Sequence, residues 1–160
     1  GSTNVRRAAG AALSKVTQGL DILKGMLPVA AVLVLSRHIW FGIEESLLWS
    51  ATAFAAVLGH DFTPWLGFRG GKGVNTTVGA FLLVAPIPVI GGISMFYLLG
   101  LVTPIVSIRS LVMGLTIPVL AGILRMPTAV ILASCLASVM LFIRHKSNIK
   151  RLLSGSELQP

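Results

Sequence analysis

Apolar runs of 12 to 18 residues, separated by short polar breaks, make up most of this 160-residue chain. A helix rises about 1.5 Å per residue, and about 20 mostly apolar residues cross a hydrocarbon core of about 30 Å. With a few flanking residues each, the runs predict membrane-spanning helices. The six predicted spans are Leu20–Ser36, Ser46–Leu58, 75–86, 88–105, Leu111–Leu124 and Pro127–Ile143.

The two middle spans come from one apolar stretch, Val78–Val106, which is 29 residues long. As a single helix it would measure about 44 Å, well beyond the hydrocarbon core. The segment Pro86-Ile87-Pro88 divides it. The first piece is short, so we expect it to be buried among other helices or to require a locally thinner bilayer.

Charge supports the count of six spans. Two spans separate the basic N-terminal stretch 1–19 from a glycine-rich loop at 67–74, and four separate that loop from the basic tail 144–160. An even number of crossings returns all three segments to one face. That face receives Arg6, Arg7, Arg69, Lys72, Arg109 and the tail cations, and the other face receives Arg37 and Arg125. Such an excess of cations marks the cytoplasmic side.

Composition places the chain among integral membrane proteins. It is 54% hydrophobic and 11% charged, with a mean hydropathy of +0.88, whereas soluble domains carry about 25% charged residues. We therefore expect one all-α domain over 1–160, a polytopic membrane helical bundle. The net charge of +8 then indicates cytoplasmic loops and anionic partners rather than nucleic acid. The single cysteine, Cys135, excludes an intrachain disulfide and a multi-cysteine metal site.

The loop Gly67-Phe68-Arg69-Gly70-Gly71-Lys72-Gly73 concentrates glycines and cations. Glycines let backbone N–H groups approach a ligand, and Arg69 and Lys72 add charge-assisted donors, so the loop suits phosphate or carboxylate. It is not a Walker A loop, because three residues rather than four separate Gly67 from Gly71-Lys72, and glycine follows the lysine. The alternative is a cytoplasmic turn whose cations only set topology.

Two more segments reach the same face, Thr3-Asn4-Val5-Arg6-Arg7 and Arg144-His145-x-x-Asn148. With the glycine loop they would form a pocket for a phosphorylated substrate at the membrane surface. A solvated interfacial histidine is the alternative for His145. The scattered carboxylates give no Ser-His-Asp set, acid pair or metal cluster, so we expect neither metal nor cofactor. Asp21 and Lys24, three residues apart, predict an intrahelical ion pair rather than catalysis.

Nearly the whole chain resembles the bacterial PlsY family of membrane acyl-phosphate:glycerol-3-phosphate acyltransferases. Gly1-Ser2-Thr3-Asn4-Val5-Arg6-Arg7 is similar to the second half of the family motif G-S-G-N-x-G-A-T-N-V-x-R, which places the essential arginine at Arg7. The other matching segments are Asp21-Ile22-Leu23-Lys24-Gly25 (D-x-x-K-G), Leu58-Gly59-His60 with Pro64 and Gly67 to Val74 (the glycerol-3-phosphate loop), Val106 to Leu111 (a serine-bearing turn), and Arg144 to Glu157 (the last motif).

The resemblance implies that the 1-hydroxyl of glycerol 3-phosphate attacks a long-chain acyl phosphate, giving lysophosphatidic acid and phosphate. Lys72 and Arg7 would neutralise phosphate, Asn148 would orient glycerol hydroxyls, and His145 would act as general base or only as a donor. A substrate phosphate oxygen is an alternative acceptor for the proton. Further substrate contacts are expected from Thr3, Asn4, Arg69, Gly70, Gly71, Gly73 and Ser110, and structural roles from Asp21, Lys24, His60 and Glu157.

The same resemblance implies a multi-pass protein of the bacterial inner membrane with its active site on the cytoplasmic face. Its expected partners are membrane lipid and the soluble enzyme that makes acyl phosphate. Family members have seven helices, and the first of them, with the opening G-S-G-N, would precede residue 1. Arg109 stands where the family has a small residue. The rival functions are a small-anion transporter gated by the glycine loop and a non-catalytic protein that binds phospholipid headgroups.

Overall fold

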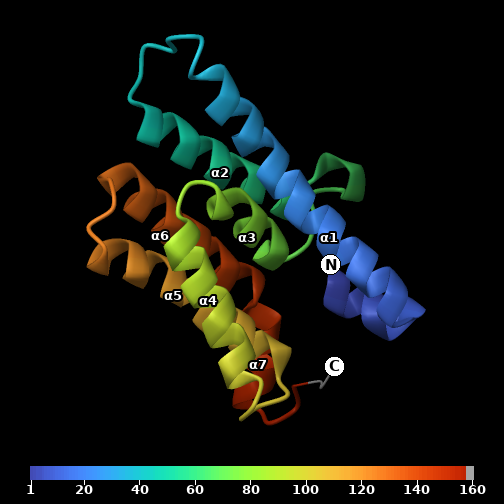
Figure 1. Cartoon of the computed structure of the whole chain (residues 1–160). Helices are drawn as coiled ribbons and strands as arrows, with labels where there is room; N and C mark the ends of the chain where they lie inside the picture. Colours follow the sequence, from blue (N-terminus) through green and yellow to red (C-terminus); the bar gives the residue numbers. More distant parts are fainter. Residues whose placement is uncertain (158–160) are drawn as a thin grey trace.

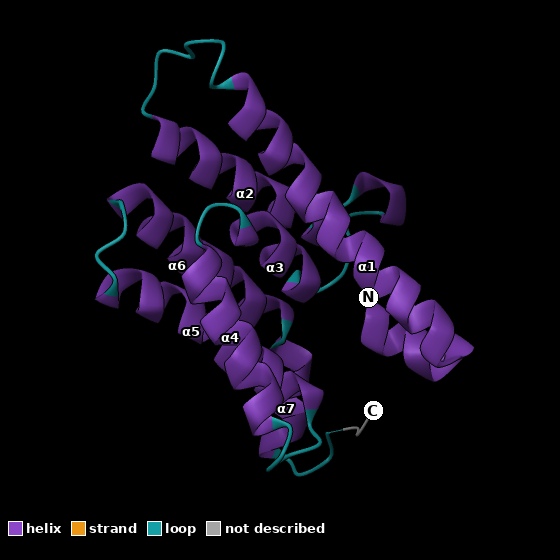
Figure 2. Cartoon of the chain, in the orientation of Figure 1, coloured by secondary structure: helices purple, strands orange, loops and turns teal. Residues whose placement is uncertain are grey.

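The computed structural model describes residues 1–157 and is helical throughout, with no strand in that range (Figures 1 and 2). The expected all-α class is therefore confirmed. The last three residues of the predicted basic tail lie outside the described residues. The helices are α1 (Ser2–Leu35), α2 (Glu45–Asp61), a 3₁₀ turn η1 (Pro64–Leu66), α3 (Val74–Leu82), α4 (Pro86–Leu99), α5 (Val106–Ile123), α6 (Thr128–Arg144) and α7 (Lys146–Leu153).

Helix lengths only partly match the six predicted spans. Among the described residues, α1 and α5 are long and apolar enough to cross a membrane alone, and α6 with α7 passes only as a pair bent by 58°. Helix α3 has nine residues, about 14 Å, or half a hydrocarbon core. It packs between α1, α2 and α4, and its residues from Thr76 to Phe81 are buried. The short piece is thus buried among helices, as expected, while the number of crossings stays a prediction.

The break between α3 and α4 lies at 83–85, not at the expected Pro86-Ile87-Pro88. Pro86 is the first residue of α4, where its missing N–H costs nothing because that position has no partner within the helix. Ala85 has φ −141° and ψ 64°, since a residue before proline is excluded from helical geometry. Proline therefore starts α4, and the non-helical Ala85 before it keeps α3 and α4 from joining into one helix.

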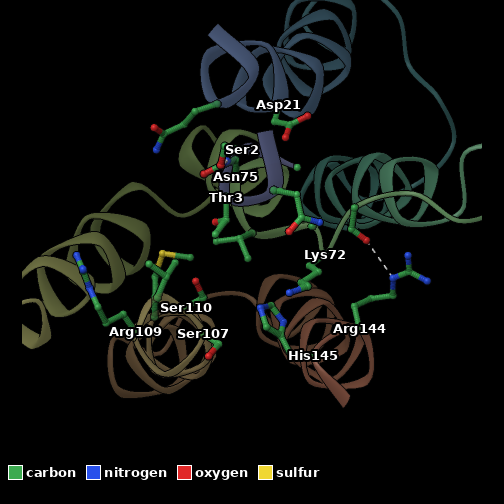
Figure 3. A pocket seen from close by; sticks show the side chains of 18 of the residues that line it. Ser2, Thr3, Asp21, Lys72, Asn75, Ser107, Arg109, Ser110, Arg144 and His145 are labelled. Atoms are coloured by element: carbon green, nitrogen blue, oxygen red, sulfur yellow. Dashed lines mark hydrogen bonds between the residues drawn. The ribbon is translucent and has the colours of Figure 1, made fainter. Parts of the chain in front are cut away.

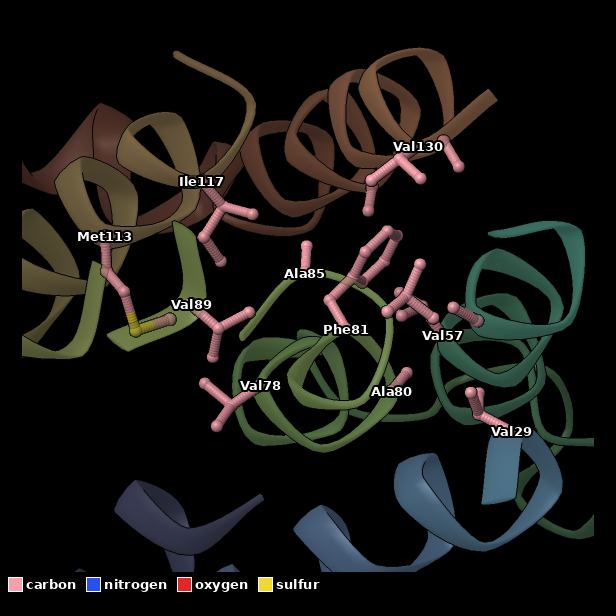
Figure 4. Close-up of a cluster of buried hydrophobic side chains, with 14 residues drawn as sticks. Val29, Val57, Val78, Ala80, Phe81, Ala85, Val89, Met113, Ile117 and Val130 are labelled. Carbon is pink, nitrogen blue, oxygen red and sulfur yellow. The ribbon is translucent and has the colours of Figure 1, made fainter. Parts of the chain in front are cut away.

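A cluster of buried apolar side chains surrounds α3 and holds the bundle together (Figure 4). Phe81 of α3 is 0% exposed and lies between α2, α4 and α6. Many large apolar side chains instead lie on the outer surface of the bundle, as on any helical protein surrounded by lipid. Examples are Ile90, Leu98, Val119, Ile123, Leu132 and Leu136.

Helices α1 and α3 touch backbone to backbone through two glycines. A Cβ at Gly25 would overlap the carbonyl oxygen of Thr76, and one at Gly79 would overlap that of Ile22. Membrane helices use small residues in this way because close backbone approach gives them contact area that lipid cannot supply. This crossing fixes α1 against the short helix that follows the glycine loop.

We expect Gly79→Ala to destabilise the fold by about 1–3 kcal/mol, because the added methyl group meets backbone that must move. Gly122→Ala, on α5 with open space around its Cβ position, is the matched control and gains helix propensity of up to about 1 kcal/mol. Thermal unfolding in detergent compares the two. Equal unfolding temperatures would show that α1 and α3 can move apart around the methyl group without loss of stability.

Candidate active site

A cavity of about 620 Å³ opens where the three predicted segments meet (Figure 3). The polar residues lining it come from the N-terminal segment, the glycine loop, α3, α5 and the α6–α7 junction. They include Ser2, Thr3, Asn4, Arg7, Gly70, Gly71, Lys72, Gly73, Asn75, Ser107, Arg109, Ser110, Arg144, His145, Asn148, Arg151 and Glu157. An apolar side is formed by Ile93, Phe96 and Met113.

The N-terminal segment reaches the cavity because α1 breaks at Gly10, where φ is 86°. Residues before Gly10 fold back, and the Ser14 hydroxyl donates to the Ser2 carbonyl at 2.9 Å. The Asn75 amide of α3 donates to the Ser2 hydroxyl at 3.1 Å. A left-handed φ of this kind favours glycine, so Gly10 is what returns Thr3, Asn4 and Arg7 to the cavity.

The glycines of the loop pack directly on the end of α2. The Gly70 N–H donates to the Asp61 carbonyl at 3.1 Å, and a Cβ on Gly70 would overlap the His60 carbonyl oxygen. A Cβ on Gly71 would overlap the His60 ring, and Gly73 has φ +71°. In this structure the Gly70 N–H is already used by Asp61, so the phosphate contact expected from that amide stays a prediction that requires this bond to open. In the described chain no acceptor meets the N–H groups of Gly71 and Gly73.

Arg144, at the end of α6, fixes the loop from the opposite side. Its Nε donates to the Gly71 carbonyl at 3.0 Å and its Nη2 to the Gly70 carbonyl at 2.8 Å. Its guanidinium also lies 5.4 Å from the centre of the Phe62 ring. The sequence placed Arg144 in a segment that would form the pocket, without a partner for it. The position next to His145 was the available signal, but a contact between residues 73 positions apart cannot be deduced from spacing.

Lys72 extends from the loop to α7, where its Nζ donates to Asn148 Oδ1 at 2.6 Å. The Asn148 amide in turn donates to Glu157 Oε1 at 2.5 Å. Burial lowers the pKa of the Lys72 ammonium, and the Glu157 carboxylate partly restores it. The structure thus holds Lys72 and Asn148 side by side, as the sequence predicted for a shared anion pocket.

Glu157 anchors the tail to α5 and α7. It accepts from Ser107 at 2.9 Å and pairs with Arg151, whose Nε lies 2.7 Å from Oε2. Burial alone would raise the pKa of this carboxyl, but the hydrogen bonds from Asn148, Ser107 and Arg151 together hold it below the ordinary value. The ion pair with Arg151 fits the structural role expected for Glu157, and Ser107 is a partner that the sequence did not indicate.

His145 follows the last residue of α6 and is 2% exposed, so the alternative of a solvated histidine is wrong. Its Nδ1 lies 2.8 Å from the Leu141 carbonyl. A carbonyl only accepts, so Nδ1 carries the proton and Nε2 is left as an acceptor. Burial lowers the pKa of His145 to about 4, although the bond to Leu141 opposes this. The imidazole is therefore neutral near pH 7.

Ser110, Arg69 and Arg109 lie in three different settings. Ser110 is buried and lines the cavity. Arg69 is exposed and outside the lining, so the structure does not bring it to the other predicted contacts. Arg109 lies 4.1 Å over the Phe96 ring and donates to the Phe96 carbonyl at 3.0 Å. It therefore ties α5 to α4 at the edge of the cavity.

Three of the four residues expected to be structural, Asp21, Lys24 and His60, lie together beside the loop. Lys24 Nζ lies 2.6 Å from Asp21 Oδ1, which is the ion pair predicted from their spacing. His60 Nδ1 lies 3.7 Å from the same oxygen. In the described part of the chain no group of three or more His, Cys, Asp and Glu could hold a metal ion.

Fold and site together define an integral membrane protein with a cationic, serine- and asparagine-lined cavity for a small anionic substrate. Residues 1–155 match the family model for glycerol-3-phosphate acyltransferase. The glycerol-3-phosphate acyltransferase of Clostridium acetobutylicum is 46% identical over 157 residues, covering 98% of this chain and 79% of that protein. That of Geobacter sulfurreducens is 36% identical, covering 98% of this chain and 77% of that protein. The chain belongs to the glycerol-3-phosphate acyltransferase family.

The fold agrees with a solved member of the family. The crystal structure of PlsY (YgiH), an integral membrane glycerol 3-phosphate acyltransferase, in its glycerol 3-phosphate form matches with a TM-score of 0.89 and 28% identity. The match covers all of this chain and 77% of that one. The lysophosphatidic acid form of the same protein gives a TM-score of 0.87. The expected resemblance to the PlsY family is therefore confirmed.

Proposed function

We propose that this enzyme transfers a fatty acyl group from an acyl phosphate to the 1-hydroxyl of glycerol 3-phosphate, giving lysophosphatidic acid and inorganic phosphate. The observation that carries this proposal is the pair of Lys72 and Asn148, joined at 2.6 Å beside the neutral His145 in one cavity. Forms of the related PlsY with glycerol 3-phosphate and lysophosphatidic acid support this acceptor and product.

The cationic side of the cavity would bind phosphate. Lys72 and Arg7 line it, and the N–H groups of Gly71 and Gly73 supply donors without an acceptor in the described chain. Ser110 adds a buried hydroxyl from α5. Charge-assisted and backbone donors of this kind suit phosphate oxygens. Two phosphate-bearing reactants repel each other, so neutralising them is a main task of the protein.

The reaction needs no covalent enzyme intermediate. The glycerol oxygen forms a bond to the acyl carbonyl carbon, the bond from that carbon to the phosphate oxygen breaks, and the hydroxyl loses its proton. Because Nδ1 of His145 is bound to Leu141, Nε2 is the nitrogen that accepts from the hydroxyl and orients it. The departing phosphate, a stronger base than an imidazole of pKa about 4, is the final acceptor of the proton.

The apolar side of the cavity supports a long-chain donor. Ile93 and Phe96 of α4 and Met113 of α5 would contact the first carbons of the acyl chain while its phosphate meets the cations. The cation distribution supports a cytoplasmic active-site face in a bacterial inner membrane. Acyl phosphate would then come from a soluble enzyme on that side.

Acyl transfer in membranes, measured with labelled glycerol 3-phosphate and acyl phosphate, tests this function. We expect Lys72→Ala to lower the rate by about 10²–10³-fold, because a preorganised charge on the reacting phosphates is lost. Lys15→Ala, an exposed cation on α1, is the control and keeps the rate. Movement of glycerol 3-phosphate into sealed vesicles without acylation would instead support the transporter. Headgroup binding without either activity would support the non-catalytic alternative.

A further inference from the structure

The segment 62–68, between α2 and the glycine loop, presents large apolar side chains to the outside of the molecule. Trp65 is 92% exposed, Leu66 64% and Phe68 63%. We call residues 62–68 the aromatic turn. None of these three side chains lines the main cavity, but Trp65 and Leu66 line a second cavity of about 600 Å³, which also touches Gly70 and Gly71.

The backbone of the aromatic turn is closed by its own hydrogen bonds. The Gly67 N–H donates to the Pro64 carbonyl at 2.9 Å and the Phe68 N–H to the Thr63 carbonyl at 3.0 Å. Gly67 and Phe68 both have positive φ, 56° and 61°. A bulky residue rarely adopts that conformation, and such strain concentrates at functional segments. Here the strained backbone holds an exposed phenylalanine beside an exposed tryptophan and leucine.

The length of α2 would place the aromatic turn near a membrane surface. Helix α2 has 17 residues, about 25 Å, and so covers most of a hydrocarbon core of about 30 Å. Its last residues meet the ion pair of Asp21 and Lys24 on α1, which marks the end of the apolar region. Tryptophan and other aromatic residues are enriched where hydrocarbon meets water.

We propose that the aromatic turn is buried among the lipid headgroups of the surrounding membrane, with Trp65, Leu66 and Phe68 in contact with lipid. Arg69, exposed at its end, supplies a cation for lipid phosphate. The turn continues directly into Gly70, Gly71 and Lys72, so its contact with lipid holds the glycine loop at the level of the membrane surface. The partner is the lipid surface, because the turn extends the lipid-facing exterior of the bundle.

Tryptophan fluorescence tests this placement. Residues 1–160 hold three tryptophans, and Trp40→Phe with Trp49→Phe leaves Trp65 as the one tryptophan among them. In vesicles of phosphatidylcholine and phosphatidylglycerol, we expect its emission to be blue-shifted. Its emission should be at least threefold weaker in lipids brominated near the headgroup than in the same lipids without bromine. Aqueous iodide should quench it little.

Strong quenching by iodide together with no effect of bromine would overturn the proposal, since the turn would then face water. Protection from iodide that appeared only after adding a soluble protein fraction would overturn it too, in favour of a protein partner. A second measurement avoids the tryptophan substitutions. In a Cys135→Ser background, Leu66→Cys should react at least tenfold more slowly with a water-soluble maleimide than Ser154→Cys, an exposed tail position. Equal rates would contradict lipid contact. Neither readout depends on acyl transfer.

Discussion

Replacing His145 by alanine is expected to lower the rate of acyl transfer by about 10²-fold, because the glycerol hydroxyl loses the acceptor that positions it, and a displacement of about 1 Å can cost about that much. The reason lies in its fixed tautomer. The Leu141 carbonyl holds the proton on Nδ1, so Nε2 is the acceptor that meets the glycerol hydroxyl. Alanine removes this acceptor without changing the cations that bind phosphate. Affinity for glycerol 3-phosphate should therefore change far less than the rate.

The matched control is His38→Ala, which removes an exposed histidine from the loop between α1 and α2. It should keep the wild-type rate. Because His145 is buried, gel filtration in detergent must show that the His145→Ala protein remains folded. A folded variant working within threefold of the wild-type rate would remove His145 from the reaction.

The pH dependence of this effect follows from burial. Burial lowers the pKa of His145 to about 4, so the neutral, accepting form predominates at every pH above that value. The substrate phosphate titrates near pH 6, but dividing the wild-type rate by the His145→Ala rate cancels that contribution. We expect this ratio to be constant from about pH 5.5 to 8 and to fall only towards pH 4. A fall centred near pH 6.5 would mean that His145 is solvated during turnover.

The sequence predicted which segments form the site, because each carries cations or polar residues inside an apolar chain. The parity of crossings, applied to these charges, gathered Arg7, Lys72 and His145 on one face, and all three line one cavity. The ion pair of Asp21 and Lys24 was predictable for a similar reason, since a spacing of three fixes neighbours on a helix. Charge and parity therefore predicted which segments meet, and local spacing predicted the pair within one helix.

Contacts between distant segments were not predictable in the same way. Arg144 binds loop carbonyls 73 and 74 positions away, and Ser107 binds Glu157 50 positions away. Nothing in the composition of either segment marks its partner. For α3, the sequence predicted a short helix but not the residue at which it ends. Apolar character extends through Val106, but α3 ends at Leu82 and Pro86 starts a new helix, so α3 is too short to cross the membrane alone.

The glycines of the loop have two physical roles, and the sequence indicated only one of them. From the sequence, its glycines bring backbone donors close to an anion. In the structure, Gly70 and Gly71 also allow the loop to lie directly on the His60 and Asp61 end of α2. Both demands act on the same residues, so the loop position and the phosphate site cannot vary independently.

This double role predicts that Gly70→Ala abolishes measurable activity. The added Cβ would overlap the His60 carbonyl oxygen and lie 2.9 Å from that of Asp61. Both are backbone atoms at a helix end, so the loop must move instead. Movement weakens the bonds from Arg144 to the Gly70 and Gly71 carbonyls and displaces Lys72 from Asn148. A displacement of about 1 Å in a reacting group can cost about 10²-fold, and here the whole phosphate site shifts.

Gly122→Ala is the control for Gly70→Ala, because Gly122 lies on α5 outside the cavity, with open space around its Cβ position. It should retain full activity. Binding of glycerol 3-phosphate, measured by calorimetry on detergent-purified protein, separates a displaced site from a lost fold. For folded Gly70→Ala we expect at least tenfold weaker binding. Unchanged binding and activity would show that the loop adjusts around a methyl group, and that close packing on α2 does not set the position of Lys72.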